Sequence, residues 1–122
     1  MNSSQVTQAI LKLNRETAEG KILWDVNKRT PSSLNAGEEL QGNTFLAAVM
    51  EKSFRLYKLQ QRAYHGYDEG WDVVDSYRLE MVDSSRNTEW IFPDDSAIAD
   101  LYQTVLFQTS GAQSFFDSFL SE

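Results

Sequence analysis

The 122-residue chain contains no cysteine and only one histidine, His65. Without thiols it can form neither a disulfide, nor a cysteine-ligated zinc or iron–sulfur centre, nor a thiol nucleophile. A single imidazole also excludes any site that needs two. Hydrophobic residues make up 41% of the chain and charged residues 24%, a globular composition. We therefore expect one domain of residues 1–122 that needs no metal and no cofactor.

Long apolar runs are also missing. No stretch approaches the ~18 apolar residues of a membrane-spanning helix. The first residues, Met-Asn-Ser-Ser-Gln-Val, lack the basic start and apolar core of a signal peptide. The sequence therefore predicts a cytoplasmic protein without a membrane partner.

Basic residues are scarce in the second half of the chain. Residues 1–42 carry five basic and five acidic side chains, and residues 43–66 carry four and one. Residues 67–122 carry two basic side chains against twelve carboxylates, a net charge of −10 within a chain of net charge −7. This sign disfavours contact with a nucleic-acid backbone. The charge either keeps the protein soluble or steers a charged protein partner.

Apolar spacing near the start predicts a helix. Val6, Ile10 and Leu13 recur at intervals of four and three residues, as on one face of an α-helix. Gly20 follows, where helices often end in the left-handed conformation. Across residues 22–26 the apolar period then changes to two, which predicts a strand with one buried face.

The middle of the chain has two interpretations. Residues 28–42 are rich in turn-forming residues and predict a flexible loop. Within residues 44–66, strand-like alternation of Phe45, Ala47 and Val49 competes with a helical face. Leu46, Met50, Phe54 and Tyr57 form that helical face. Because neighbouring leucines fall outside it, we predict two strands, with the helix as the alternative.

Later segments predict more strands and then helices. Residues 66–75 favour a loop, residues 77–81 alternate as in a half-buried strand, and residues 83–87 supply turn chemistry before a return over 89–92. Pro93 ends this strand because proline donates no hydrogen bond.

Two helices are predicted after Pro93. Asp94, Asp95 and Ser96 provide capping groups for the first. Ser110 and Gln113 match a capping box for a short final helix. The fold class is therefore α+β, with an N-terminal helix, an antiparallel meander of four or five strands and a C-terminal helix pair.

Several motifs spread along the chain carry a family resemblance. They are Leu13-Asn14-x-x-Thr17-x-x-Gly20-Lys21-Ile22-x-Trp24, Tyr77-Arg78-Leu79-Glu80, Trp90-Ile91-Phe92-Pro93 and Leu101-Tyr102. With them the chain resembles a set of small bacterial α+β proteins of unknown function. The resemblance skips residues 28–42 and 64–75. It implies the helix–meander–helix order and no catalytic residue.

Few residues suggest a catalytic or metal-binding site. His65, close to Asp68 and Glu69, could form a general base. Nothing around it matches a catalytic triad, so a surface histidine is the simpler interpretation. The acids at positions 68–75 fail the spacing of a calcium loop, because the sixth position from Asp68 is Val73 and not glycine. We therefore predict no catalytic residue.

Aromatic residues are the remaining candidates. Trp71 lies between Gly70 and Asp72, where it could anchor an interface or fold back onto the sheet. The final helix carries Phe115, Phe116 and Phe119, of which we expect two to face the domain; the third would meet a partner, with a homodimer as the commonest case, unless the helix lies in a groove.

These observations predict a non-enzymatic protein–protein interaction or accessory protein. Its predicted partner-binding residues are Trp71, Phe116 and Phe119 as anchors and Asp68, Glu69 and Asp72 as a charged rim. Two alternatives remain. One is an acidic nucleic-acid mimic that inhibits a DNA- or RNA-binding enzyme. The other is a small-ligand or enzymatic site that uses His65 and Tyr67.

Overall fold

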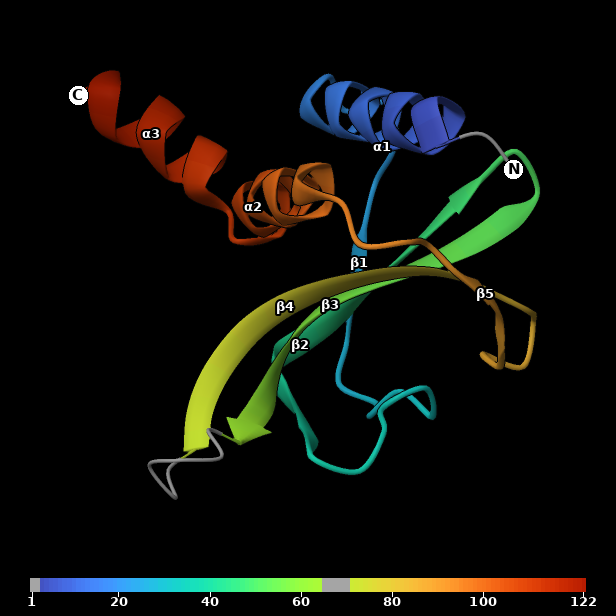
Figure 1. Cartoon of the computed structure of the whole chain (residues 1–122). Helices are drawn as coiled ribbons and strands as arrows, with labels where there is room; N and C mark the ends of the chain where they lie inside the picture. Colours follow the sequence, from blue (N-terminus) through green and yellow to red (C-terminus); the bar gives the residue numbers. More distant parts are fainter. Residues whose placement is uncertain (1–2, 65–70) are drawn as a thin grey trace.

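The computed structural model describes residues 3–64 and 71–122, with the side chains of residues 63, 64 and 71 left undescribed. In chain order the elements are α1 (Ser3–Ala18), β1 (Asp25–Asn27), β2 (Glu38–Val49), β3 (Lys52–Tyr64), β4 (Trp71–Val82), β5 (Thr88–Ile91), α2 (Ser96–Thr109) and α3 (Ala112–Leu120). The five strands form one antiparallel sheet in sequential order, and α1 and α2 lie on one side of it (Figure 1). The predicted α+β class and the order of its elements are confirmed.

The ambiguous middle segment forms a hairpin of long strands. Val49 pairs with Lys52 across a two-residue turn, in which Met50 and Glu51 have φ angles of 50° and 67°. Positive φ at both turn residues matches the strand twist of a tight hairpin. The next hairpin, β3–β4, pairs from Ser53↔Val82 out to Tyr64↔Trp71. The predicted two strands are confirmed, and the helical alternative is wrong.

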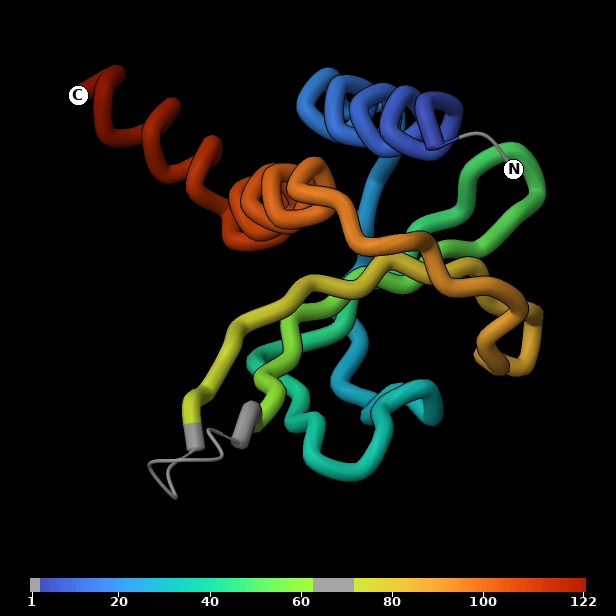
Figure 2. The backbone as a smooth tube through the Cα atoms, in the orientation of Figure 1, coloured from blue at the N-terminus to red at the C-terminus, as the bar shows by residue number. Residues whose placement is uncertain are grey.

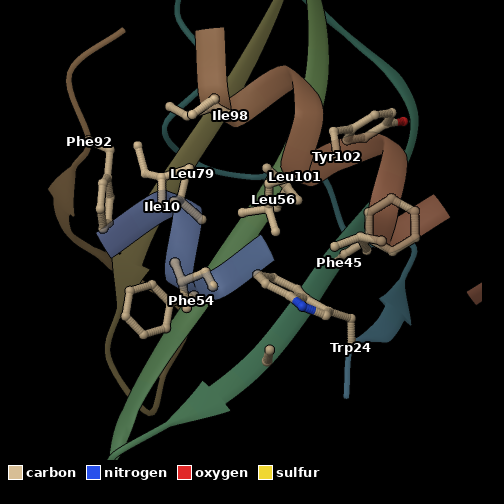
Figure 3. Close-up of a cluster of buried hydrophobic side chains, with 14 of the residues drawn as sticks. Ile10, Trp24, Phe45, Phe54, Leu56, Leu79, Phe92, Ile98, Leu101 and Tyr102 are labelled. Atoms are coloured by element: carbon tan, nitrogen blue, oxygen red, sulfur yellow. The ribbon is translucent and has the colours of Figure 1, made fainter. Parts of the chain in front are cut away.

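The main hydrophobic core lies between the sheet and helices α1 and α2. Figure 3 shows side chains from α1, α2 and three central strands meeting there. Five of the labelled side chains are fully buried, namely Ile10, Leu56, Leu79, Ile98 and Leu101. The predicted stripe of α1 contributes to this core, because Val6, Ile10 and Leu13 are all buried there.

The opposite sheet face is covered by the connection between β1 and β2. Tyr57 and Glu80 follow core residues in their strands, so they point away from the helices. Both are buried, and Ser33 from the connection accepts or donates a hydrogen bond at Tyr57 Oη over 2.7 Å and donates one to Glu80 Oε1 over 3.1 Å. Figure 2 shows the chain of residues 28–37 passing on the side of the sheet away from the helices. The predicted flexible loop of residues 28–42 is thus a packed cover, and its last residues already belong to β2.

Two other predicted boundaries and one predicted helix cap are wrong. The first strand covers only Asp25–Asn27, because Trp24 uses its main-chain N–H to donate to the side chain of Gln108 instead of to a neighbouring strand. Strand β4 begins at Trp71, inside the predicted loop of residues 66–75. Helix α3 has Gly111 as its N-cap, without a side-chain cap, so the predicted capping box does not form.

Candidate functional site

Helix α3 presents an uncovered apolar face. Its apolar residues recur at helical spacing and form one stripe, which we call the α3 stripe: Ala112, Phe115, Phe116, Phe119 and Leu120. No residue of α3 is buried, and Phe119 and Leu120 are 61% and 78% exposed. The rings of Phe115 and Phe119 stack with centroids 5.4 Å apart. The prediction that two phenylalanines face the domain is therefore wrong.

The direction of α3 explains this exposure. Gly111, between α2 and α3, has a φ of 78°, in the left-handed region that only glycine adopts readily. The turn there sends α3 away from α1 and from the sheet, with its C-terminus at the edge of the molecule (Figure 1). Only Phe116 contacts α2 through a ring, with its centroid 6.3 Å from that of Phe107.

A cleft opens beside the base of α3. It has a volume of about 580 Å³ and lies where the end of α1, the following connection and α2 meet. We call it the α1–α2 cleft, and its lining is Thr17, Ala18, Gly20, Leu23, Gln103, Thr104, Phe107, Gln108 and Gln113. Its volume falls within the ~300–1,000 Å³ of typical ligand pockets, so it can accept a large side chain. Phe107 both lines the cleft and touches the α3 stripe, so the two surfaces are continuous.

Hydrogen bonds fix the floor of this cleft. The Gln108 amide donates to the carbonyl oxygens of Thr17 and Ile22 over 3.1 and 2.9 Å, and its oxygen accepts from Trp24 N over 2.9 Å. The indole N–H of Trp24 donates to Thr17 Oγ1 over 3.0 Å. These contacts join α1, α2 and the connection before β1 at the base of the cleft.

The predicted partner-binding residues do not gather in one place. Phe116 and Phe119 lie together on α3. Asp72 is exposed near the start of β4, which Figure 1 shows away from α3 at the end of the β3–β4 hairpin. Trp71 begins β4, but its side chain is outside the described part, as are Asp68, Glu69, His65 and Tyr67. Within the described residues, the aromatic anchors therefore have no acidic rim from β4.

Sequence reasoning missed three contributors to this surface. Leu120 continues the spacing of the α3 stripe, a signal that was present in the sequence. Leu23 is 70% exposed and Phe107 is 43% exposed beside the cleft. Leu23 occupied the outward position of the predicted strand, but nothing local indicated that it would lie next to α2.

A second cluster of functional-group residues lies on the opposite sheet face. Arg55 and Glu80 are a cross-strand pair, buried to 5% and 0% exposure, in which Arg55 Nε donates to Glu80 Oε1. Arg55 also donates to the carbonyl oxygen of Arg86 and to Thr88 Oγ1, both over 3.1 Å. No buried side-chain nitrogen or oxygen in the described residues lacks a hydrogen-bond partner. This buried ion pair is thus satisfied from within the protein.

The cluster continues to the cover of residues 28–37 through Arg78. Its guanidinium donates to Glu38 Oε2 over 2.9 Å, to Tyr57 Oη over 3.1 Å and to the Ser33 carbonyl oxygen over 3.2 Å. These hydrogen bonds from Arg78 hold the pKa of Glu38 at about 2, below its ordinary 4.5. Burial raises the pKa of Tyr57. Glu38 begins β2, and its Oε1 accepts a hydrogen bond from Asn35 N of the cover over 2.8 Å. Charge-assisted hydrogen bonds of Arg78 and Glu38 therefore fasten the cover to the sheet.

The depressed pKa of Glu38 makes this fastening acid-sensitive. A carboxylate whose folded-state pKa is below its unfolded value stabilises the fold above the unfolded pKa, and loses that contribution as pH falls through the folded one. We therefore expect the stability difference between wild type and Glu38→Gln to shrink as pH falls from about 4.5 to about 2. Urea unfolding at pH 6, 4 and 3 measures it. The exposed neighbour Glu39 supplies the control variant Glu39→Gln, and equal behaviour of the two variants would contradict the role of the Glu38–Arg78 contact.

The described residues contain neither a membrane-spanning helix nor a cluster of metal-binding side chains. In residues 3–64 and 71–122, no helix has the length and apolar character needed to cross a membrane. The same part of the chain holds no group of three or more acidic or histidine side chains placed to bind a metal ion.

Comparison with known proteins assigns no function to these surfaces. The chain matches no protein-family model, and no curated protein and no solved structure is significantly similar to it. The resemblance to small bacterial proteins therefore stays a prediction, and the function has to be argued from the α3 stripe and the α1–α2 cleft.

Proposed function

We propose that this protein is a non-enzymatic interaction protein that binds another polypeptide through the α3 stripe. The observation that carries the proposal is that α3 buries none of its residues although its apolar side chains all lie on one face. An isolated nine-residue helix is marginal in water, and most helical stability comes from packing an apolar face. A partner that covers the stripe would supply that packing.

The polar residues of the protein support this proposal. The best-connected charged groups, Arg55, Glu80 and Arg78, make internal hydrogen bonds that join strands and attach the cover. Their donors and acceptors are directed at one another and at the main chain. They are therefore better explained as parts of the fold than as groups that meet a substrate.

The recognition mode is that of an amphipathic helix laid against an apolar surface. Such helices bind through anchors spaced three, four and seven residues apart. Phe116 and Phe119 are three residues apart, and Phe115 and Phe119 are four apart, as are Phe116 and Leu120, so these residues match the three- and four-residue spacing. Aromatic residues, including phenylalanine, are enriched in the buried centres of protein interfaces.

Photocrosslinking from α3 tests the proposal. A photoreactive phenylalanine analogue placed at Phe119, in cells that make the protein, is expected to give a covalent polypeptide adduct. The same analogue at Ser118, one residue along on the polar face of α3, is the matched control and is expected to give at least about tenfold less adduct. Equal adduct yield from both positions, or none from Phe119, would contradict the proposal.

A further inference from the structure

We infer that the polypeptide bound by the α3 stripe is a second copy of this chain, and that the stripe of each copy covers the α1–α2 cleft of the other. The inference rests on the proposed function, since it identifies the partner of that same surface. Three properties of the stripe and the cleft carry it: their position side by side, their combined area and their lack of charge.

The first property is that a projection and a hollow lie next to each other on one chain. A two-fold symmetric interface uses the same patch on both copies. If residue i of one copy contacts residue j of the other, residue j of the first copy contacts residue i of the second. The patch must therefore contain its own complement. The α3 stripe projects from the molecule, and the cleft opens at its base through Phe107, whose ring lies 6.3 Å from that of Phe116. Two such patches, related by a two-fold axis, place one projection over each hollow.

The second property is area. The large apolar side chains of the combined patch are 43% to 78% exposed, and they are Leu23, Phe107, Phe115, Phe116, Phe119 and Leu120. At ~200 Å² for each fully exposed side chain of this size, the patch presents roughly 700 Å² of apolar surface. The largest apolar patch of a typical monomer is ~300–600 Å². A stable standard-size interface buries ~800 Å² on each partner, so this patch with its polar margin is of the size that a dimer needs.

The third property is that the patch carries no charge. None of the residues of the stripe or of the cleft lining is ionisable. The carboxylate of Asp117 lies outside the stripe, and it accepts a hydrogen bond over 2.9 Å from Gln113 at the margin of the cleft. In a chain of net charge −7, a patch containing carboxylates would repel its own copy. Neutrality removes that repulsion, and it gives a basic partner no carboxylate to recognise.

The mass of the purified protein in solution tests this inference. Sedimentation equilibrium over a range of concentrations is expected to show wild type reaching twice the 14.0 kDa mass of one chain. Phe119→Asp places a charge in the stripe of both copies and should raise the dissociation constant by at least about 100-fold, because two anchors are lost in each dimer. Leu23→Asp should weaken the dimer through the cleft. Both side chains are largely exposed in the monomer, so the variants are expected to fold.

Ser118→Asp is the matched control. It adds the same charge to the polar face of α3 and is expected to leave the dimer intact. A wild type that stays at 14.0 kDa at all concentrations overturns the inference. A dimer that survives Phe119→Asp overturns it as well, and a dimer that survives Leu23→Asp overturns the pairing of stripe with cleft.

The crosslinking experiment separates this inference from the proposed function. An adduct from Phe119 with the mass of two chains supports both. An adduct with a different polypeptide, together with a monomeric purified protein, overturns the second copy as partner and leaves α3 as a binding element. Absence of any adduct, with a monomeric protein, overturns both.

Discussion

Replacement of Glu80 by alanine is expected to lower the free energy of unfolding by about 3–5 kcal/mol, because it leaves a buried guanidinium without its carboxylate. Arg55 is 5% exposed, so water cannot replace the lost partner. Its two other hydrogen bonds, to the Arg86 carbonyl and to Thr88 Oγ1, do not neutralise the charge. Urea unfolding of Glu80→Ala against wild type measures the loss.

The control for this prediction removes both charges. In Arg55→Met/Glu80→Leu no charge remains buried, and apolar side chains of similar volume fill the space. Such replacements of buried ion pairs are often neutral or stabilising, so we expect the double variant to recover most of the stability lost in Glu80→Ala. A loss below about 1 kcal/mol in Glu80→Ala would show that water reaches Arg55, which would contradict the closed cover of residues 28–37.

The second large effect is expected in the main core, where Leu101→Ala should lower the free energy of unfolding by about 3–5 kcal/mol. Leu101 is fully buried between α2 and the sheet, so truncation removes apolar contacts and leaves a cavity (Figure 3). Leu120→Ala makes the same chemical change on the α3 stripe, where the side chain is 78% exposed. Measured on dilute protein, that variant should differ from wild type by less than about 0.5 kcal/mol.

This pair of variants distinguishes the core from the binding surface. Leu120→Ala should instead weaken the association that α3 makes. If dilute Leu120→Ala lost as much stability as Leu101→Ala, α3 would be packed as part of the monomer core. Thermal unfolding at several protein concentrations provides the measurement, because association makes the melting temperature rise with concentration and a substitution at the intermolecular contact reduces that rise.

Most elements of the fold could be predicted because their apolar period is local information. Alternation at Phe45, Ala47 and Val49 identified β2, and the spacing of Val6 and Ile10 identified α1. The apolar spacing of a helix or a strand shows which of its faces packs against the core, without information about the residues it packs against.

Boundaries that depend on distant partners could not be predicted. The first strand is short because Gln108, more than eighty residues away, binds the main chain of Trp24. There a tertiary contact overrides the local preference.

The buried ion pair was hidden by the same period that revealed the strands. Arg55 and Glu80 alternate with core residues, so the pattern placed them on a solvated face. They are buried because the connection before β2 covers that face, and its turn-rich sequence indicated only a loop. Recognising the cover requires knowing that Ser33 reaches Glu80, 47 residues further along the chain.

The exposed surface that we propose binds a partner was predicted in part. Phe116 and Phe119 were identified as anchors from their residue type and position, and both lie exposed on the α3 stripe. The α1–α2 cleft could not be predicted, because two of its lining residues, Thr17 and Phe107, are separated in the sequence by all the strands of the sheet. Continuity between stripe and cleft is a property of the folded chain alone.

The adduct formed from position 119 inside the cell tests the central claim most directly, since that claim is that α3 meets another polypeptide through its apolar face. We predict a single major adduct from position 119, with the mass of two chains, and little from position 118 on the same helix. Equal labelling from both positions, or no protein adduct from position 119, would contradict the claim that the α3 stripe is a binding surface.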